Sequence, residues 1–247
     1  MELPLGLFGI ALATVTLPYL SRQHATASHS AFAATLDWSM RLVILISLPA
    51  AIGLIVLAEP LVTTIFYGGA FSDRDVSLAA LALQAFSFGL IGFSYVKILA
   101  PAYFAREDTV TPVRIGLAAL AVNFLLSVTL AWYLTRRGFE GTHAGLALAI
   151  SVAALLNAWL LYRGLRRDGV LELRPGWLAY LARLTVASAA MCAMLFWLAK
   201  PLAWWLDASL TGRVVELAVN ILAGASVYFA VLLLSGLRPS HLGMRPH

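Results

Sequence analysis

The stretch LVILISLPAAIGLIVLA, residues 42–58, decides the fold class of this chain. It contains no Asp, Glu, Lys or Arg, and most of its 17 residues are Leu, Ile or Val. A helix needs roughly 20 mostly apolar residues to cross the hydrocarbon core of a bilayer. The stretch is therefore predicted to span a membrane as a helix.

The same criterion finds seven uncharged stretches along the chain, which predict an all-α bundle of about seven transmembrane helices. The sixth stretch is short, but the segment 175–182 precedes it, so a tilted helix that begins near Trp177 is long enough to span. The seven stretches are residues 3–21, 42–58, 76–96, 115–135, 144–162, 184–199 and 217–237.

The composition excludes a soluble catalytic domain. Of the 247 residues, 61% are hydrophobic and 12% are charged, whereas a soluble domain has about 45–50% apolar and about 25% charged residues. The net charge of +5 does not indicate nucleic-acid binding, because the basic residues lie in short clusters between apolar stretches. The single cysteine, Cys192, excludes an intrachain disulfide.

The sequence offers little catalytic chemistry. It has no nucleophile elbow, no phosphate-binding glycine loop and no histidine pair at metal-binding spacing. We therefore expect no catalytic residues, no metal site and no cofactor, and we expect that the protein is not an enzyme.

The basic residues predict the orientation of the helices. One face of the bundle, which includes the tail at residues 238–247, carries twelve of the 17 Lys and Arg residues, and the opposite face carries five. Cytoplasmic loops attract this excess, so we expect a cytoplasmic C-terminal tail and residue 1 on the outer side. No basic flank precedes the first span, so either the chain is inserted in an unusual way or it is the back part of a longer protein.

Residues 59–75 form a connection of unusual character. Leu61, Ile65, Phe66, Tyr67 and Phe71 surround the pair at 68–69, which is Gly-Gly. This pattern predicts an extracytoplasmic interfacial half-helix that is closed by a glycine turn.

Polar groups within the apolar stretches are candidate functional residues, because an ionisable side chain in lipid costs about 2.5–3.5 kcal/mol. Lys97 follows 21 uncharged residues, and either it extends to the cytoplasmic interface or it faces an anionic ligand from a cavity. Asn123 and Ser127 share one helix face. Such groups usually bond to neighbouring helices, and ion binding is the alternative role.

Pro18, Pro49 and Pro101 fall within or near apolar stretches. Each removes one helical hydrogen bond and favours a kink. Kinks suit a transporter that moves, but they also occur in static bundles.

Several strings together resemble one family, the MurJ/MviN bacterial lipid II flippases, and specifically its C-terminal half. The resemblance runs through nearly the whole chain, and KILAPAYFARED is its most specific part. The strings are MELP (1–4), FGIALATVTLPYLSR (8–22), LDWSMRL (36–42), LPAAIGLIVLAEPLVTTIFYGGAF (48–71), KILAPAYFAREDTVTPVRI (97–115) and PGWLAYLARL (175–184).

The resemblance implies a transporter of the MOP superfamily, with fourteen helices in two lobes around a cationic cavity. Residues 1–247 would be the C-terminal lobe, helices eight to fourteen, and would be inactive without the N-terminal lobe. The implied activity moves lipid II, the undecaprenyl-pyrophosphate-linked disaccharide-pentapeptide, from the inner to the outer leaflet by alternating access. In the family, the last two helices help to form a groove for the lipid tail.

The resemblance also implies site residues. Glu2 matches the acid of an arginine-containing motif, although the arginine would lie before Met1. Lys97 matches the lysine of the KxLAP string, and Arg106 and Asp108 match the charged turn that follows it. These four residues are the predicted substrate-binding residues. Asn123 corresponds to part of a sodium site in some members, but Ser127 stands where an acid is expected.

We therefore predict a multi-pass protein of the bacterial inner membrane whose partners are lipid II, membrane lipids and the N-terminal lobe, without nucleic acid. Three alternatives remain open at this point. They are a MOP-type flippase for another polysaccharide-lipid such as an O-antigen precursor, a non-transporting membrane scaffold, and a polyprenyl-phosphate enzyme.

Overall fold

The computed structural model describes residues 29–237. Within this part of the chain all regular structure is helical, apart from a single bridge between Gly68 and Phe71. The helices are α2 (His29–Val56), α3 (Ala58–Phe66), α4 (Asp73–Phe88), α5 (Leu90–Phe104), α6 (Val110–Arg136), α7 (Thr142–Arg167), α8 (Trp177–Leu198), α9 (Leu202–Asp207) and α10 (Leu210–Leu234).

Six helical segments of the described residues are long and apolar enough to cross a bilayer. They correspond to the second to seventh predicted spans, which confirms the prediction of an all-α membrane helix bundle. The first predicted span, at 3–21, and the predicted tail, at 238–247, lie outside the described residues. The six segments are Ser30–Val56, Asp73–Phe104, Val110–Arg136, Thr142–Arg167, Trp177–Leu198 and Leu210–Leu234.

Two predicted boundaries were wrong, because polar residues are tolerated in helix turns that extend past the apolar core. The segment 29–41, expected in a connection, is the first part of α2. The third span continues to Phe104, so Lys97 lies inside α5 rather than after a helix. The predicted start of the sixth span near Trp177 is confirmed.

The segment 59–75 contains the expected short helix and glycine turn. Helix α3 ends at Phe66, and the chain then reverses through Gly68 and Gly69, whose φ angles are 144° and 61°. Ser72 begins α4 with a capping box, because its hydroxyl accepts from the Asp75 N–H and the Asp75 carboxylate accepts from the Ser72 N–H. The position of this segment on the extracytoplasmic side stays a prediction.

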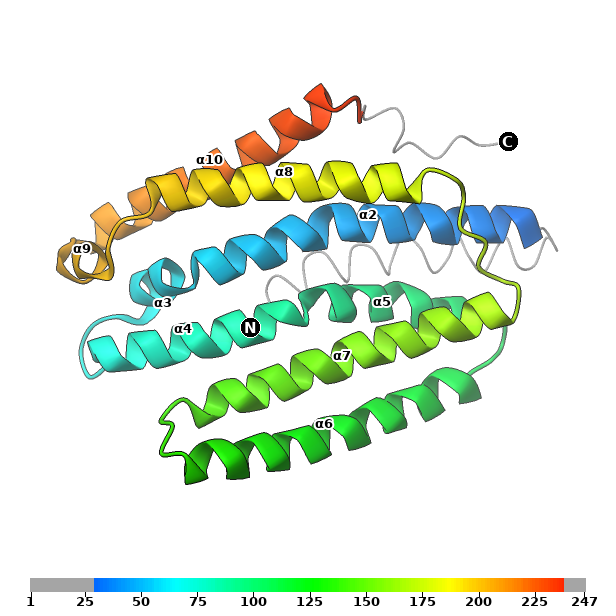
Figure 1. The fold of residues 1–247 in the computed structure, drawn as a ribbon, viewed down its shortest axis with the longest axis horizontal. Coiled ribbons are helices and arrows are strands. Elements are labelled where there is room, and N and C mark those ends of the chain that lie inside the picture. The colour runs from blue at the N-terminus through cyan, green and yellow to red at the C-terminus, as the bar shows by residue number, and fades with distance from the viewer. Residues whose placement is uncertain (1–28, 238–247) are drawn as a thin grey trace.

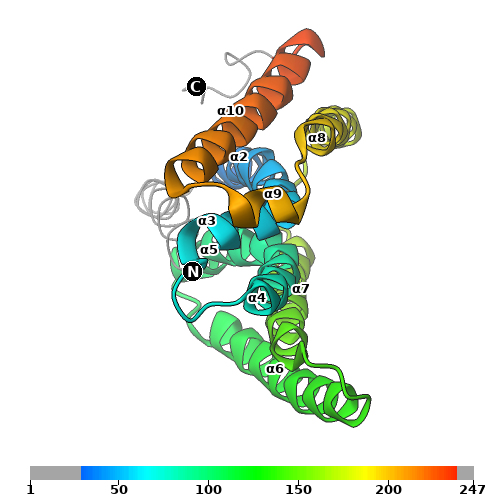
Figure 2. The same ribbon diagram turned by 90° about the vertical axis from the view of Figure 1, so that its left-hand side faces the viewer.

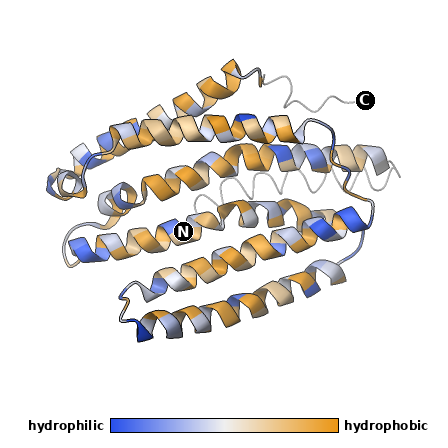
Figure 3. Ribbon diagram, viewed as in Figure 1, coloured by the Kyte–Doolittle hydropathy of each residue, from blue (hydrophilic) through white to orange (hydrophobic). Residues whose placement is uncertain are grey.

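The helices succeed one another across the molecule from α6 at one edge to α10 at the other (Figure 1). α6 packs on α7, α7 packs on α4 and α5, these pack on α2, and α2 packs on α8, which pairs with α10. Figure 2 shows the same succession from one end. The helices are mainly apolar along their lengths, and hydrophilic residues gather towards their ends (Figure 3).

The interior is divided into two large buried clusters, and α2 contributes to both. Phe32, Leu36 and Val43 of α2 lie in the cluster shared with α5 and α7. Ile44 and Leu45 lie in the cluster shared with α8, α9 and α10. Helix α2 is therefore the central element that joins the α4–α7 part of the bundle to the α8–α10 part.

The break between α4 and α5 lies at Gly89, where α7 approaches closely. The Ser151 hydroxyl of α7 donates to the carbonyls of Ala85 at 2.7 Å and of Phe86 at 3.1 Å. These carbonyls belong to the last turn of α4, where helical donors are scarce. A Cβ atom on Gly89 would lie 2.6 Å from the Ser151 Cα, so this site requires glycine.

Gly92 allows a second close approach of α5 to the backbone of α7. A Cβ at this position would lie 2.6 Å from the Leu155 nitrogen and 2.7 Å from the Ala154 carbonyl carbon. The buried residues of α7 between 145 and 158 are all small, and Ala154 among them faces Gly92 and permits this approach. They are Gly145, Ala149, Ser151, Ala153, Ala154 and Ala158.

Gly92→Ala is expected to lower the free energy of unfolding by about 1–3 kcal/mol, because the new methyl group meets backbone atoms that cannot move independently. The measurement is the apparent melting temperature in detergent. Gly116→Ala in α6 is the matched control, since its Cβ would have no atom within 4 Å. Equal melting temperatures for the two variants would contradict this account of the α5–α7 contact.

Gly164→Ala tests a third close contact, in which the new Cβ would collide with the Tyr103 hydroxyl. That hydroxyl donates to the Leu161 carbonyl at 3.0 Å and is fully buried. We expect Gly164→Ala to destabilise the wild-type chain more than the Tyr103→Phe chain, because the second substitution removes the colliding atom. Melting temperatures of the four chains measure this, and equal effects in both backgrounds would refute it.

Candidate functional site

Lys97 is the one predicted substrate-binding residue that lies within a described membrane span. It is half-buried on α5, about 10 Å of helix from the end at Phe104. The opposite face of α5, with Ile98, Leu99 and Tyr103, is fully buried. Lys97 therefore lies on the less covered face of its helix, where a cation at this depth requires a polar environment.

Pro101 lies one helical turn after Lys97. A proline inside a helix has no N–H to donate to the carbonyl four residues earlier, so the turn between them lacks one backbone hydrogen bond. The predicted kink at Pro101 therefore affects the helical turn that begins at Lys97.

Arg106 and Asp108 lie in the turn between α5 and α6, and both have local partners. Arg106 forms an ion pair with Asp168 at 3.3 Å, which ties this turn to the end of α7. Asp108 accepts the Thr111 N–H at 3.0 Å near the start of α6. Local structure therefore already accounts for both side chains, and their substrate-binding role stays a prediction.

The Thr111 contacts lower the pKa of Asp108 below its usual value, so the carboxyl is charged at neutral pH. Because the pKa of Asp108 is lower in the folded chain than in the unfolded chain, its carboxylate stabilises the fold at pH values above the unfolded pKa. The contribution is lost as the pH falls through the folded pKa.

Asn123 is half-buried on α6, and the Ser127 hydroxyl donates to its side-chain oxygen at 3.4 Å. The shared helix face is as their spacing predicted, and the contact lies within α6 rather than with a neighbouring helix. Among residues 29–237, no group of three or more His, Cys, Asp or Glu side chains is arranged to hold a metal ion. Ion binding by Asn123 stays a prediction, and Glu2 lies outside the described residues.

Sequence reasoning missed a buried ion pair near the start of α2. Asp37 is only 2% exposed and accepts three hydrogen bonds. The donors are Arg41 Nε at 2.9 Å, Trp177 Nε1 at 2.6 Å and the Arg174 N–H at 3.2 Å. The carboxylate is thus compensated by a charge and by two neutral donors, as a buried charge requires.

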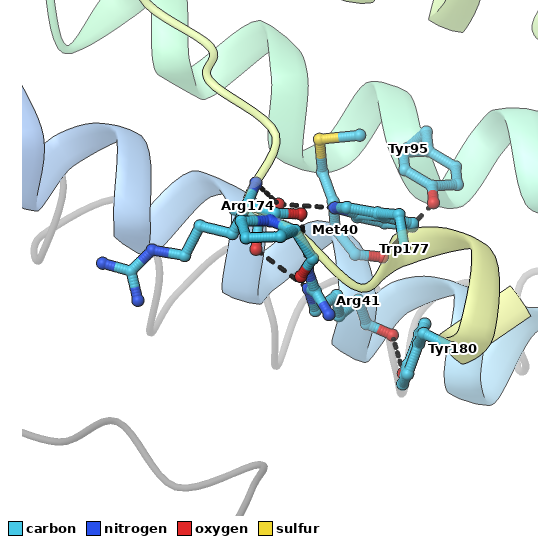
Figure 4. Close-up of polar contacts among 8 residues, drawn as sticks. Met40, Arg41, Tyr95, Arg174, Trp177 and Tyr180 are labelled. Carbon is cyan, nitrogen blue, oxygen red and sulfur yellow. Dashed lines mark hydrogen bonds and ion pairs between the residues drawn. The ribbon is translucent and has the colours of Figure 1, made fainter.

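Arg41 extends the same cluster towards α8. Its guanidinium donates to the Arg174 carbonyl at 3.1 Å and lies over the rings of Trp177 and Tyr180, 4.9 and 5.5 Å from their centroids. The Tyr180 hydroxyl donates to the Arg41 carbonyl at 2.7 Å (Figure 4). The cluster fixes the start of α8 on α2.

A second buried cation, Arg213, performs a similar task at the other end of the hairpin formed by α8 and α10. It donates to the Leu206 carbonyl at 2.7 Å and to the Tyr67 carbonyl at 3.5 Å. Its guanidinium also lies 4.8 Å from the Tyr67 ring centroid. Arg213 thereby joins α10 to α9 and to the glycine turn.

The two ends of the bundle differ in charge. The end that contains the α5–α6 turn and the α7–α8 connection has nine described basic residues and five acidic residues, and the opposite end has five basic and six acidic residues. We name the first the basic end. Its basic residues are Arg41, Lys97, Arg106, Arg114, Arg163, Arg166, Arg167, Arg174 and Arg183.

Comparison with known proteins places this architecture in a family. The family described as "Lipid II flippase MurJ" matches residues 1–229. A probable lipid II flippase MurJ of Vibrio cholerae is 44% identical over 238 residues, which cover 96% of this chain and 44% of that protein. The Haemophilus influenzae counterpart is 39% identical over 248 residues, which cover 98% of this chain and 47% of that protein.

A solved structure titled "Lipid II flippase MurJ, inward closed conformation" has the same fold. It superposes with a TM-score of 0.69 at 22% identity, over 94% of this chain and 44% of that chain. The chain thus spans less than half the length of the relatives that it matches. The resemblance found in the sequence is confirmed: this multi-pass membrane chain belongs to the MurJ family.

Proposed function

We propose that this chain is the C-terminal lobe of a lipid II flippase, comprising helices eight to fourteen of a fourteen-helix transporter in the bacterial inner membrane. The observation that carries the proposal is the family match over residues 1–229, together with relatives whose names specify lipid II. The flippase acts as a transporter and not as an enzyme. An N-terminal lobe completes it.

The physical task is to carry a charged headgroup across hydrocarbon. A pyrophosphate with its sugar-peptide cannot leave water without compensation, whereas a polyprenyl tail is stable in lipid. A cation within the span, such as Lys97, offsets part of the desolvation cost of the pyrophosphate. Arg106 and Asp108 of the following turn and Glu2 of the first span complete the proposed substrate-binding set.

The proposed orientation follows from the charge difference between the two ends. The basic end faces the cytoplasm, since cytoplasmic segments carry the excess of Lys and Arg. The segment 59–75 then lies on the outer side. Lys97 lies nearer to the cytoplasmic end of the span Asp73–Phe104, at the level where a headgroup would enter from the inner leaflet.

A chimera tests the flippase assignment. We expect that this chain, when it replaces the matched region of the Vibrio cholerae relative, supports growth and lipid II translocation in cells depleted of their own flippase. The 247-residue chain alone is expected to support neither, because half of the cavity is absent. Lipid II on the outer leaflet and chimera levels in the membrane are measured together.

Two outcomes would overturn parts of this proposal separately. A chimera that reaches normal membrane levels and moves no lipid II, but moves another polyprenyl-linked saccharide, refutes the substrate. Growth supported by the chain alone refutes the assignment of a single lobe.

Lys97→Ala in the chimera is expected to reduce lipid II translocation by about tenfold, the equivalent of one lost charge-assisted contact. Lys97→Arg should retain most of the activity because it keeps the charge. Arg137→Ala is the control, since Arg137 lies at the opposite end, where it stacks 5.3 Å from the Tyr133 centroid. Full translocation by Lys97→Ala at normal membrane levels would show that Lys97 is an interfacial anchor.

A further inference from the structure

Helix α2 contains a proline in the middle of a membrane span, and this proline deprives one particular carbonyl of its donor. In an α-helix the N–H of each residue donates to the carbonyl four residues earlier. Pro49 has no N–H, so the Leu45 carbonyl loses its helical partner. The proline ring also crowds this carbonyl and tilts it away from the helix axis.

A side chain from a distant helix supplies the missing donor. The hydroxyl of Tyr228, on α10, donates to the Leu45 carbonyl at 2.7 Å. Tyr228 is 1% exposed and Leu45 is also buried, so no water can take the place of the hydroxyl. The axis of α2 changes direction part-way along its length, and α10 lies beside α8 on that side of the bundle (Figure 1).

Two other tyrosines show that this contact is different from ordinary packing. Tyr180 donates to the Arg41 carbonyl at 2.7 Å, and Tyr95 donates to the Met40 carbonyl at 3.3 Å. Four residues after these acceptors stand Leu45 and Ile44, which both have an N–H. Their carbonyls therefore keep a helical donor when the tyrosine is removed, whereas the Leu45 carbonyl does not.

We propose that Tyr228 and Pro49 form one joint, in which the tyrosine hydroxyl replaces the N–H that the proline lacks and so holds the bend of α2 against α10. Tyr228 is thus a positioning residue. Because the hydroxyl is the donor that the Leu45 carbonyl has in place of a helical N–H, a displacement of α10 changes the shape of α2. The α8–α10 hairpin and the central helix move together.

A double-substitution cycle tests the joint in the 247-residue chain in detergent. Tyr228→Phe leaves a buried carbonyl without a donor and should lower the apparent melting temperature by roughly 5 °C. Pro49→Ala restores the N–H of the backbone, so the further drop caused by Tyr228→Phe in that background should be smaller by roughly half or more. Equal drops in the two backgrounds would overturn the proposal.

Tyr180→Phe is the matched control for the cycle. It removes the same hydroxyl from the same hairpin, and its acceptor is also a carbonyl of α2. Its effect on the melting temperature should be the same in the wild-type and Pro49→Ala backgrounds, since no proline follows Arg41 by four residues. If Tyr228→Phe alone fails to fold, recovery of folded protein by Pro49→Ala supports the joint, and failure of both chains refutes it.

Distances across the bend of α2 provide a second measurement. A general loss of stability would not change them in the same way. Spin labels at Ser30 and Glu59, both exposed, are introduced in a Cys192→Ser background. In the wild type the distance between the labels should have one narrow distribution. Tyr228→Phe should broaden this distribution. The Pro49→Ala/Tyr228→Phe chain should give a narrow distribution at a longer distance. An unchanged distribution in Tyr228→Phe would show that the hydroxyl does not hold the bend.

Discussion

The lack of water in the hydrocarbon core is the constraint on which the structure depends, because each backbone polar group there needs a partner within the protein. Unbroken helices meet this need by themselves. Two interruptions in the described spans meet it through a neighbouring helix instead. At the Gly89 break the donor is Ser151 of α7, and at Pro49 it is Tyr228 of α10. Each interruption therefore also fastens two helices together.

Charged side chains obey the same constraint. Asp37 is satisfied by Arg41, Trp177 and the Arg174 backbone, and Arg213 donates to the carbonyls of Leu206 and Tyr67. Both clusters fasten the α8–α10 hairpin, one at each end. Lys97 is only half-buried, on the less covered face of α5. Its role in substrate contact stays a prediction.

The sequence was sufficient to predict the membrane spans but not the contacts between helices that are distant in the chain. Uncharged stretches located all six spans of the described residues, since length and polarity decide membrane insertion. The 29–41 part of α2 was missed because its two charged residues, Asp37 and Arg41, pair with each other inside the protein. Asp37 and Arg41 stand four apart, which is a readable ion-pair signal. Their contact with Trp177, 140 positions away, could not be predicted because it depends on tertiary packing. The same is true of Tyr228 and Leu45.

The unequal surroundings of α6 and α7 bear on which substitutions each helix can accept over time. α7 is enclosed by α4, α5 and α6, and its buried residues between 145 and 158 are all Gly, Ala or Ser. Only 6% of the apolar window of α6 is buried within the described structure. We therefore expect the sequences of relatives to differ freely among Leu, Val and Phe along the outer side of α6. The small buried positions of α7 should admit little beyond the smallest side chains, since the interior around them is close-packed.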